Sequence, residues 1–78
     1  EPGGYILVEG QKWKILKAHP YDVSLGEVGK IEVLAKDTIT LQLKDGRIAL
    51  DEIQKEGKPK MKAEDFINGL HQKTLQAE

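Results

Sequence analysis

The chain has 78 residues, of which 12 are basic and 13 are acidic, so its formal net charge of −1 lacks the basic excess typical of nucleic-acid-binding proteins. It contains no cysteine, which excludes disulfides and thiolate-bound zinc and fits a reducing compartment. A chain of this length buries about 60 % of the surface that it exposes when unfolded, and 38 % hydrophobic residues suffice to form such a core.

The two ends of the chain set the limits of the predicted domain. The first apolar run, Tyr5–Val8, is too short for a membrane span or for the core of a signal peptide. The sequence begins at Glu1 rather than at a methionine, which indicates a piece of a longer protein. Residues 72–78 show no apolar pattern and are predicted to form a frayed tail. We therefore expect residues 1–78 to form a single domain, ordered from about 4 to 71.

The N-terminal part of the chain alternates apolar and polar side chains in the manner of β-strands. Tyr5–Val8 is predicted to form a first strand, and a turn at Glu9–Gln11 connects it to a second strand over Lys12–Ala18. Trp13 and Ile15 share one face of this second strand, and the lysines beside them point to the other face. The alternation breaks after Ile15, which predicts either the end of the strand or a β-bulge.

A polar segment and a second pair of strands follow. His19–Val28 contains proline, serine and glycine and is predicted to be an exposed loop. Gly29–Lys36 is predicted to form a third strand and Thr38–Lys44 a fourth, with a tight turn between them. The side chains of the fourth strand are expected to divide into an inward set and an outward set, namely Ile39, Leu41 and Leu43, and Thr38, Thr40 and Gln42.

The last third of the chain changes from a strand pattern to a helical one. Asp45–Gly46 is a strong hairpin signal and leads into a fifth strand over Arg47–Ile53. Glu56–Pro59 cannot continue this strand, because proline lacks a backbone donor and glycine favours a turn. From Met61 to about His71 the apolar residues follow the period of a helix, with an acidic pair in its first turn. The apolar face of this predicted helix consists of Ala63, Phe66, Ile67 and Leu70.

Five short, mainly antiparallel strands and one helix carry more apolar surface than a flat sheet of this length can bury. A curled or closed sheet buries that surface, with the helix over one opening. We therefore predict a mainly β fold, namely a small OB-like or closed β-barrel of about five strands with one C-terminal helix. An SH3-like roll is the alternative architecture.

The titratable side chains form no recognisable catalytic pattern. The acid pair at 51–52 lies in a strand, where adjacent side chains point to opposite faces, and the pair at 64–65 suits the start of a helix. His19 and His71 are far apart in the sequence, and neither lies near a patterned carboxylate or a set of metal ligands. We therefore expect no metal site and no catalysis by this chain alone.

Lysines are the candidate binding groups, and they fall into two clusters. The first cluster lies on the predicted second strand and the second lies around a Glu-Gly-Lys loop: Lys12, Lys14 and Lys17, and Lys55, Lys58, Lys60 and Lys62. These side chains can form a phosphate-contacting patch, in which released counterions supply the affinity for a polyanion. The residues alone favour the other interpretation, in which the lysines form a solvated loop and strand face with no ligand.

Aromatic side chains are the second kind of candidate for nucleic-acid contacts. Phe66 lies on the apolar helix face, and Trp13 shares a face with Ile15, so both are expected in the core. Tyr21, in the predicted polar loop, is the aromatic expected to be free to stack on a base. An independent OB-type single-strand-binding domain would need Trp13 or Tyr21 on an open surface.

Motifs spread over most of the chain are similar to those of one known family. In Asp45–Leu70, the matching positions are Gly46, Glu52, Gln54, Glu56-Gly57-Lys58, Met61, Glu64-Asp65, Phe66 and Asn68-Gly69. Further matches occur at Pro2–Tyr5, Gly10–Ala18 and Gly26–Lys30, so that the likeness covers roughly residues 2 to 70. The chain thereby resembles the C-terminal domain of methionyl-tRNA formyltransferases, within the wider class of formyltransferase C-terminal domains.

The resemblance implies an accessory role for this chain in the cytoplasm. The family has an OB-like barrel attached to a Rossmann-type N-terminal catalytic domain, which moves a formyl group from 10-formyltetrahydrofolate to methionyl-tRNA. The barrel's implied role in translation initiation is to hold the initiator tRNA backbone with basic side chains, which correspond here to the two lysine clusters. No cofactor is expected in this domain itself. As an alternative, sugar-nucleotide and other formyltransferases carry similar barrels that serve as packing or assembly domains with no tRNA role.

Overall fold

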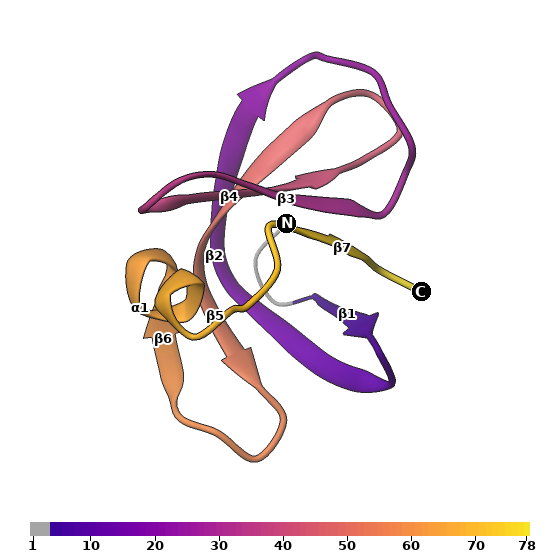
Figure 1. The fold of residues 1–78 in the computed structure, drawn as a ribbon. Coiled ribbons are helices and arrows are strands. Elements are labelled where there is room, and N and C mark those ends of the chain that lie inside the picture. Colours follow the sequence, from indigo (N-terminus) through magenta and orange to yellow (C-terminus); the bar gives the residue numbers. More distant parts are fainter. Residues whose placement is uncertain (1–3) are drawn as a thin grey trace.

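Alternating apolar and polar side chains wind the chain into a strongly curved antiparallel sheet, which the computed structural model describes for residues 4–78 (Figure 1). The elements are β1 (Tyr5–Val8), β2 (Gln11–Asp22), β3 (Lys30–Ala35), β4 (Thr38–Gln42), β5 (Arg47–Lys55), β6 (Lys60–Lys62), α1 (Ala63–Asn68) and β7 (Thr74–Gln76). Neighbouring strands follow the order β1-β2-β5-β4-β3-β7, and β6 pairs with β5 outside this path. The predicted β-barrel with one helix is confirmed, and residues 4–78 contain seven strands in place of about five.

A two-residue turn at Glu9 and Gly10 joins β1 to β2. Both residues have positive φ angles, 53° and 79°, which the preferred two-residue hairpin turns require of their central residues. The register pairs Val8 with Gln11. Beyond the turn, Trp13 and Ile15 are buried as predicted, because alternate residues of β2 face the inside of the barrel.

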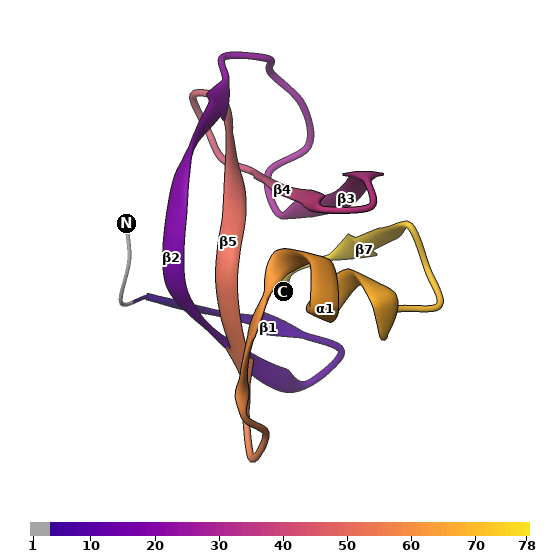
Figure 2. The same cartoon turned by 90° about the vertical axis from the view of Figure 1, so that its left-hand side faces the viewer.

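Strand β2 continues well past its predicted end. His19–Asp22, which the sequence predicts to be part of a loop, pairs with Arg47–Ala49 of β5, so β2 and β5 run side by side along the barrel (Figure 2). The register shifts on both sides of Lys17, which confirms the β-bulge alternative for the break in alternation. The polar side chains of this segment suggest a loop, but β5 supplies hydrogen-bond partners for its backbone, and these partners cannot be inferred from the segment alone.

Both faces of β4 are buried, whereas the alternation of its side chains predicted one buried and one exposed face. Ile39 and Leu41 lie in the core as expected, but Leu43 is exposed beyond the end of the strand. Thr40 and Gln42, predicted to face outward, are buried. The Gln42 amide lies under the β2–β3 loop, where Nε2 donates to the carbonyl oxygens of Ser24, Leu43 and Gly46 at 2.9, 3.0 and 3.2 Å. These hydrogen bonds compensate for the burial of a polar side chain.

Helix α1 is shorter than the apolar period predicts. Lys60–Lys62, expected in part as its first turn, pairs with β5 as strand β6, and the helix ends at Asn68 with Gly69 as its C-cap, before the predicted end near His71. Lys62 occupies the N-cap position and makes no capping hydrogen bond with its side chain. The exposed acidic pair Glu64 and Asp65 occupies the first turn, where the helix dipole favours negative charge.

The prediction of a frayed tail over residues 72–78 is wrong. Thr74–Gln76 forms β7 along the free edge of β3, and Ala77 bridges to Val8 of β1 at the other end of the sheet. The Glu78 carboxylate also accepts a hydrogen bond of 2.7 Å from the Gly10 amide. These contacts bring the two edges of the sheet together into a nearly closed barrel. Backbone pairing, buried Leu75 and partly buried Ala77 secure a segment that has no apolar period.

Apolar side chains from six strands and two residues of α1 fill the barrel. The buried cluster consists of Val8, Trp13, Ile15, Ile31, Ile39, Leu41, Leu50, Ile53, Ala63, Phe66 and Leu75. The rings of Trp13 and Phe66 meet edge to face, with centroids 4.8 Å apart and planes at 79°, where α1 covers one end of the barrel. Both aromatic residues are therefore in the core, as predicted. Within residues 4–78, no helix is long and apolar enough to cross a membrane.

Candidate nucleic-acid interface

The sheet brings five lysines from two segments of the sequence to one outer surface. Strands β2, β5 and β6 are neighbours, and the residues paired across them form two rows: Lys14, Gln54 and Lys60, and Lys17, Glu52 and Lys62. Residues directly opposite each other point to the same face of a sheet. Because Trp13 and Ile53 point inward, these rows lie outside. We call Lys12, Lys14, Lys17, Lys60 and Lys62 the outer lysine strip.

The other two predicted lysines do not share the outward register of this strip, although Lys55 lines one hollow with Lys12 and Lys14. Lys55 pairs with Trp13 and therefore points to the inner face, where its Nζ lies 5.8 Å from the Trp13 ring centroid and 5.3 Å from that of Phe66. It covers the aromatic pair at the end of the barrel by cation–π contacts. Lys58 lies in the β5–β6 turn and, like Lys55, lines a depression of about 200 Å³ whose apolar walls include Met61 and Phe66. The seven candidates thus divide into an outer group of five and a separate pair.

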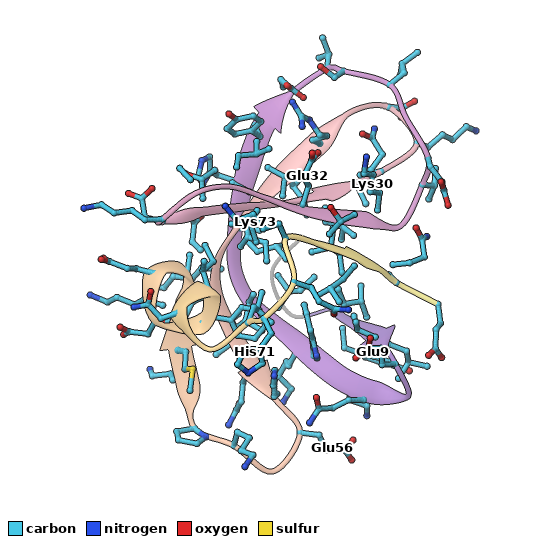
Figure 3. The ribbon with its side chains drawn as sticks, viewed as in Figure 1. Glu9, Lys30, Glu32, Glu56, His71 and Lys73 are labelled. Atoms are coloured by element: carbon cyan, nitrogen blue, oxygen red, sulfur yellow. The ribbon has the colours of Figure 1, made fainter. Side chains whose placement is uncertain are left out.

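No carboxylate in the described part of the chain forms an ion pair with a lysine of the strip. The ion pairs found within residues 4–78 are those of His19 with Asp51, and of Arg47 with Asp22 and Glu32. Two further acids, Glu9 and Glu56, lie in the β1–β2 and β5–β6 turns at one end of the barrel (Figure 3). Glu52 has its register position within the strip, Glu56 lines a hollow with Lys12 and Lys14, and four acids line another with Lys17 and Lys62, namely Asp37, Asp51, Glu52 and Glu64. The strip therefore presents exposed ammonium groups that no direct contact neutralises.

Tyr5 borders the strip, and the sequence did not identify it as a residue that could stack on a base. It pairs with Lys14 across β1 and β2, it is 58 % exposed, and the Lys12 Nζ lies 4.5 Å from its ring centroid. In the sequence Tyr5 belongs to an apolar run, which conceals its outward orientation on the edge of the sheet. Tyr21 is 44 % exposed, as predicted, but lies in β2 with the Arg47 guanidinium 5.2 Å from its ring centroid.

Arg47, the single arginine of the sequence, stabilises the fold. Its guanidinium donates two hydrogen bonds to Asp22, Nε to Oδ1 at 3.0 Å and Nη2 to Oδ2 at 2.5 Å. These hydrogen bonds lower the pKa of Asp22 from 3.8 to about 2, against a smaller opposing effect of desolvation. In return, Asp22 raises the pKa of Arg47. The pair joins the end of β2 to the start of β5 and fixes the loop that follows.

One histidine has a carboxylate partner that the sequence did not predict. His19 Nδ1 lies 2.6 Å from Asp51 Oδ2, because β2 extends far enough to pair with the middle of β5. Both side chains are about half exposed, and the hydroxyl of Ser24 is hydrogen-bonded to Asp22 rather than to this pair. Within residues 4–78, no group of three or more histidine, aspartate or glutamate side chains is arranged to hold a metal ion.

Together, the fold and the surface define a small, nearly closed β-barrel domain that presents lysines on one outer face of its sheet. The chain belongs to the formyl transferase C-terminal domain family, whose model matches residues 1–71. This result confirms the family resemblance carried by the motifs of the sequence.

Streptococcal proteins named methionyl-tRNA formyltransferase are among its relatives. The chain is 33 % identical over 73 residues to that of Streptococcus agalactiae serotype III (strain NEM316) and 36 % identical over 69 residues to that of Streptococcus sanguinis (strain SK36). The enzyme of Streptococcus equi subsp. equi (strain 4047) is 35 % identical over 69 residues. Each match covers 88 % of this chain and 22 % of the relative. The chain thus spans about a fifth of the length of the curated relatives that it matches.

Proposed function

We propose that this domain holds the backbone of initiator methionyl-tRNA for a methionyl-tRNA formyltransferase. The observation that carries the proposal is the outer lysine strip, which the sheet assembles in a member of the formyl transferase C-terminal domain family. The five ammonium groups form no ion pairs with acids of residues 4–78 and are free to replace the counterions of a polyanion.

The dimensions of the strip suit several phosphates of an RNA backbone. Strands β2 and β6 flank β5, so the two lysine rows extend over about 10 Å across the sheet. Lys12 and Lys17 are separated by about 15 Å along β2, at the rise per residue of a strand. Lysine acts as a compact charge that carries no information about base identity, so contacts of this kind position the RNA without reading its sequence.

The chemical step belongs, in this proposal, to a separate N-terminal domain. That domain would bind 10-formyltetrahydrofolate and transfer its formyl group to the amino group of methionyl-tRNA, and the barrel would contribute no catalytic group and no cofactor contact. Within residues 4–78, the His19–Asp51 pair has no nucleophilic side chain as a further hydrogen-bonded partner. We place the protein in the cytoplasm, where translation is initiated.

Binding to tRNA at two salt concentrations tests this function. The 78-residue chain should bind tRNA at low salt, and log K should fall by about 0.9 for each phosphate contact as log salt rises, if RNA follows the behaviour of duplex DNA. Binding that does not depend on salt, or no binding at low salt, contradicts the proposal.

An assembly or packing role is the second candidate, and an exposed apolar loop supports it. Val23, Leu25 and Val28 in the β2–β3 loop are 84 %, 77 % and 59 % exposed. Hydrogen bonds from Gln42 and the Asp22–Arg47 pair hold this loop in place, so its aliphatic side chains are presented in a fixed arrangement. Exposed apolar patches of this kind are typical of protein contacts. This role predicts that the domain has no affinity for tRNA, so tRNA binding at low salt that Val23→Ser and Leu25→Ser leave unchanged would count against it.

A further inference from the structure

Strand β1 presents an apolar border along the outer lysine strip. Ile6 and Val8 point inward, while Tyr5 and Leu7 point outward and are exposed. The register places Tyr5 opposite Lys14 and Leu7 opposite Lys12. An aromatic ring and a basic pair therefore share one face at the edge of the sheet.

The Tyr5 ring contributes little to the core, because more than half of the residue's surface is exposed. The Lys12 ammonium lies over one face of the ring, 4.5 Å from its centroid, so a stacked base takes the opposite face or displaces this flexible side chain, which forms no ion pair within residues 4–78. An exposed ring beside lysines offers two kinds of contact to a nucleotide. The ring can stack on a base, and the lysines can contact the flanking phosphates.

We propose that Tyr5 is a stacking platform for an unpaired nucleotide of the RNA that the strip holds, with Lys12 and Lys14 on the adjoining phosphates. This inference rests on the proposed function and adds a contact that backbone binding does not require. The nucleotide must be unpaired, since the faces of paired bases are covered by their neighbours in a helix. Stacking on tyrosine tolerates any base, because every base has a π-face.

Tyr21 supplies a matched control. It is also an exposed tyrosine beside a cationic group. However, it lies seven residues further along β2 than Lys14, the residue paired with Tyr5, which corresponds to roughly 23 Å at the rise per residue of a strand. Its ring is associated with Arg47, which is paired with Asp22. The platform hypothesis predicts an effect at Tyr5 that Tyr21 does not share.

Fluorescence anisotropy tests the inference with two labelled RNAs, namely a tRNA transcript and a fully paired RNA duplex. Each RNA is titrated with the 78-residue chain. Tyr5→Ala should weaken tRNA binding by about 5- to 10-fold, at the low end of measured base–aromatic stacking, and leave duplex binding unchanged. Tyr5→Phe should retain binding within about twofold, because the aromatic face remains. Tyr21→Ala should bind both RNAs as the wild type does.

The outcomes separate this inference from the function on which it rests. Wild-type affinity of Tyr5→Ala for tRNA, or an equal loss on both RNAs, overturns the platform while leaving lysine-based binding intact. Failure of the unmodified chain to bind tRNA at low salt overturns the proposed function itself. NMR of the unmodified chain provides a measurement that needs no variant: tRNA should shift the Tyr5 ring protons upfield, and unchanged Tyr5 resonances in the saturated complex contradict stacking.

Discussion

Arg47 and Asp22 form a forked pair in which both carboxylate oxygens accept a hydrogen bond from one guanidinium group. The pair connects the last residue of β2 to the first residue of β5, beside the exposed β2–β3 loop. Forked pairs between ionised groups are stronger and more directional than hydrogen bonds between neutral groups. This contact fixes one end of the long strand pair on which the outer lysine strip is built.

We predict that the Asp22–Arg47 pair makes folding stability depend on acidic pH. The folded state lowers the pKa of Asp22 from 3.8 to about 2. The contribution of this carboxylate is therefore fully present above about pH 4 and is lost as the pH falls through about 2, because the unfolded chain takes up the proton first. Thermal unfolding between pH 7 and pH 2 should show this decline, and Asp22→Asn should remove that part of it.

Asp45→Asn is the control for this prediction, because Asp45 lies in an exposed turn and forms no ion pair within residues 4–78. Its pH dependence should match that of the wild type. Curves for Asp22→Asn and the wild type that run parallel over the whole range would contradict the prediction.

Closure of the barrel by β7 leads to a prediction about Leu75. This side chain is buried although its flanking residues are exposed, and it is paired with Ile31 of β3. Leu75→Ala should lower the free energy of unfolding by about 2 kcal/mol, at the low end of the range for buried leucines because the site lies at the edge of the core. Urea denaturation measures this change, with exposed Thr74→Ala as the control. Equal stability of the two variants would mean that the tail does not close the barrel.

Gly46 and Gly57 both adopt positive φ angles but differ in their surroundings, which predicts different costs of substitution. A Cβ atom at Gly57 would have no atom within 4 Å, so Gly57→Ala should cost about 1 kcal/mol from backbone conformation alone. A Cβ atom at Gly46 would lie 2.5 Å from the Asp22 carbonyl oxygen and must displace backbone. Gly46→Ala should therefore be more destabilising than Gly57→Ala in urea denaturation. The reverse order would contradict the close approach of Gly46 to the end of β2.

Local periodicity was sufficient to predict that the clearly alternating segments are strands and that Phe66 lies on the buried face of a helix, although it did not predict the burial of Thr40 and Gln42. It failed where the determining contact is distant in the sequence. His19–Asp22 looked like a loop because its polarity is high, yet β5 supplies its hydrogen-bond partners. The tail at 72–78 has one buried apolar residue, and its order comes from pairing with β3 and from the bridge to Val8.

The candidate surface also has features that the local sequence predicts and features that depend on distant contacts. Clustering in the sequence identified all five lysines of the strip, but it could not separate them from Lys55, whose orientation depends on its pairing with Trp13. Tyr5 was missed because the sequence of β1 alone does not say which of its apolar residues face the core. The register with β2 decides this, and it places Tyr5 beside Lys14 on the outside.

The salt dependence of tRNA binding by two matched double variants tests the central claim most directly. Lys14→Gln with Lys60→Gln removes two charges from the strip, while Lys30→Gln with Lys73→Gln removes two from β3 and the residue before β7, on another part of the barrel (Figure 3). The two proteins have the same net charge. We predict that the strip variant lowers the slope of log K against log salt by about 2 and that the control retains the wild-type slope. Equal losses in the two variants would show that binding follows net charge, and would contradict a tRNA site on the outer lysine strip.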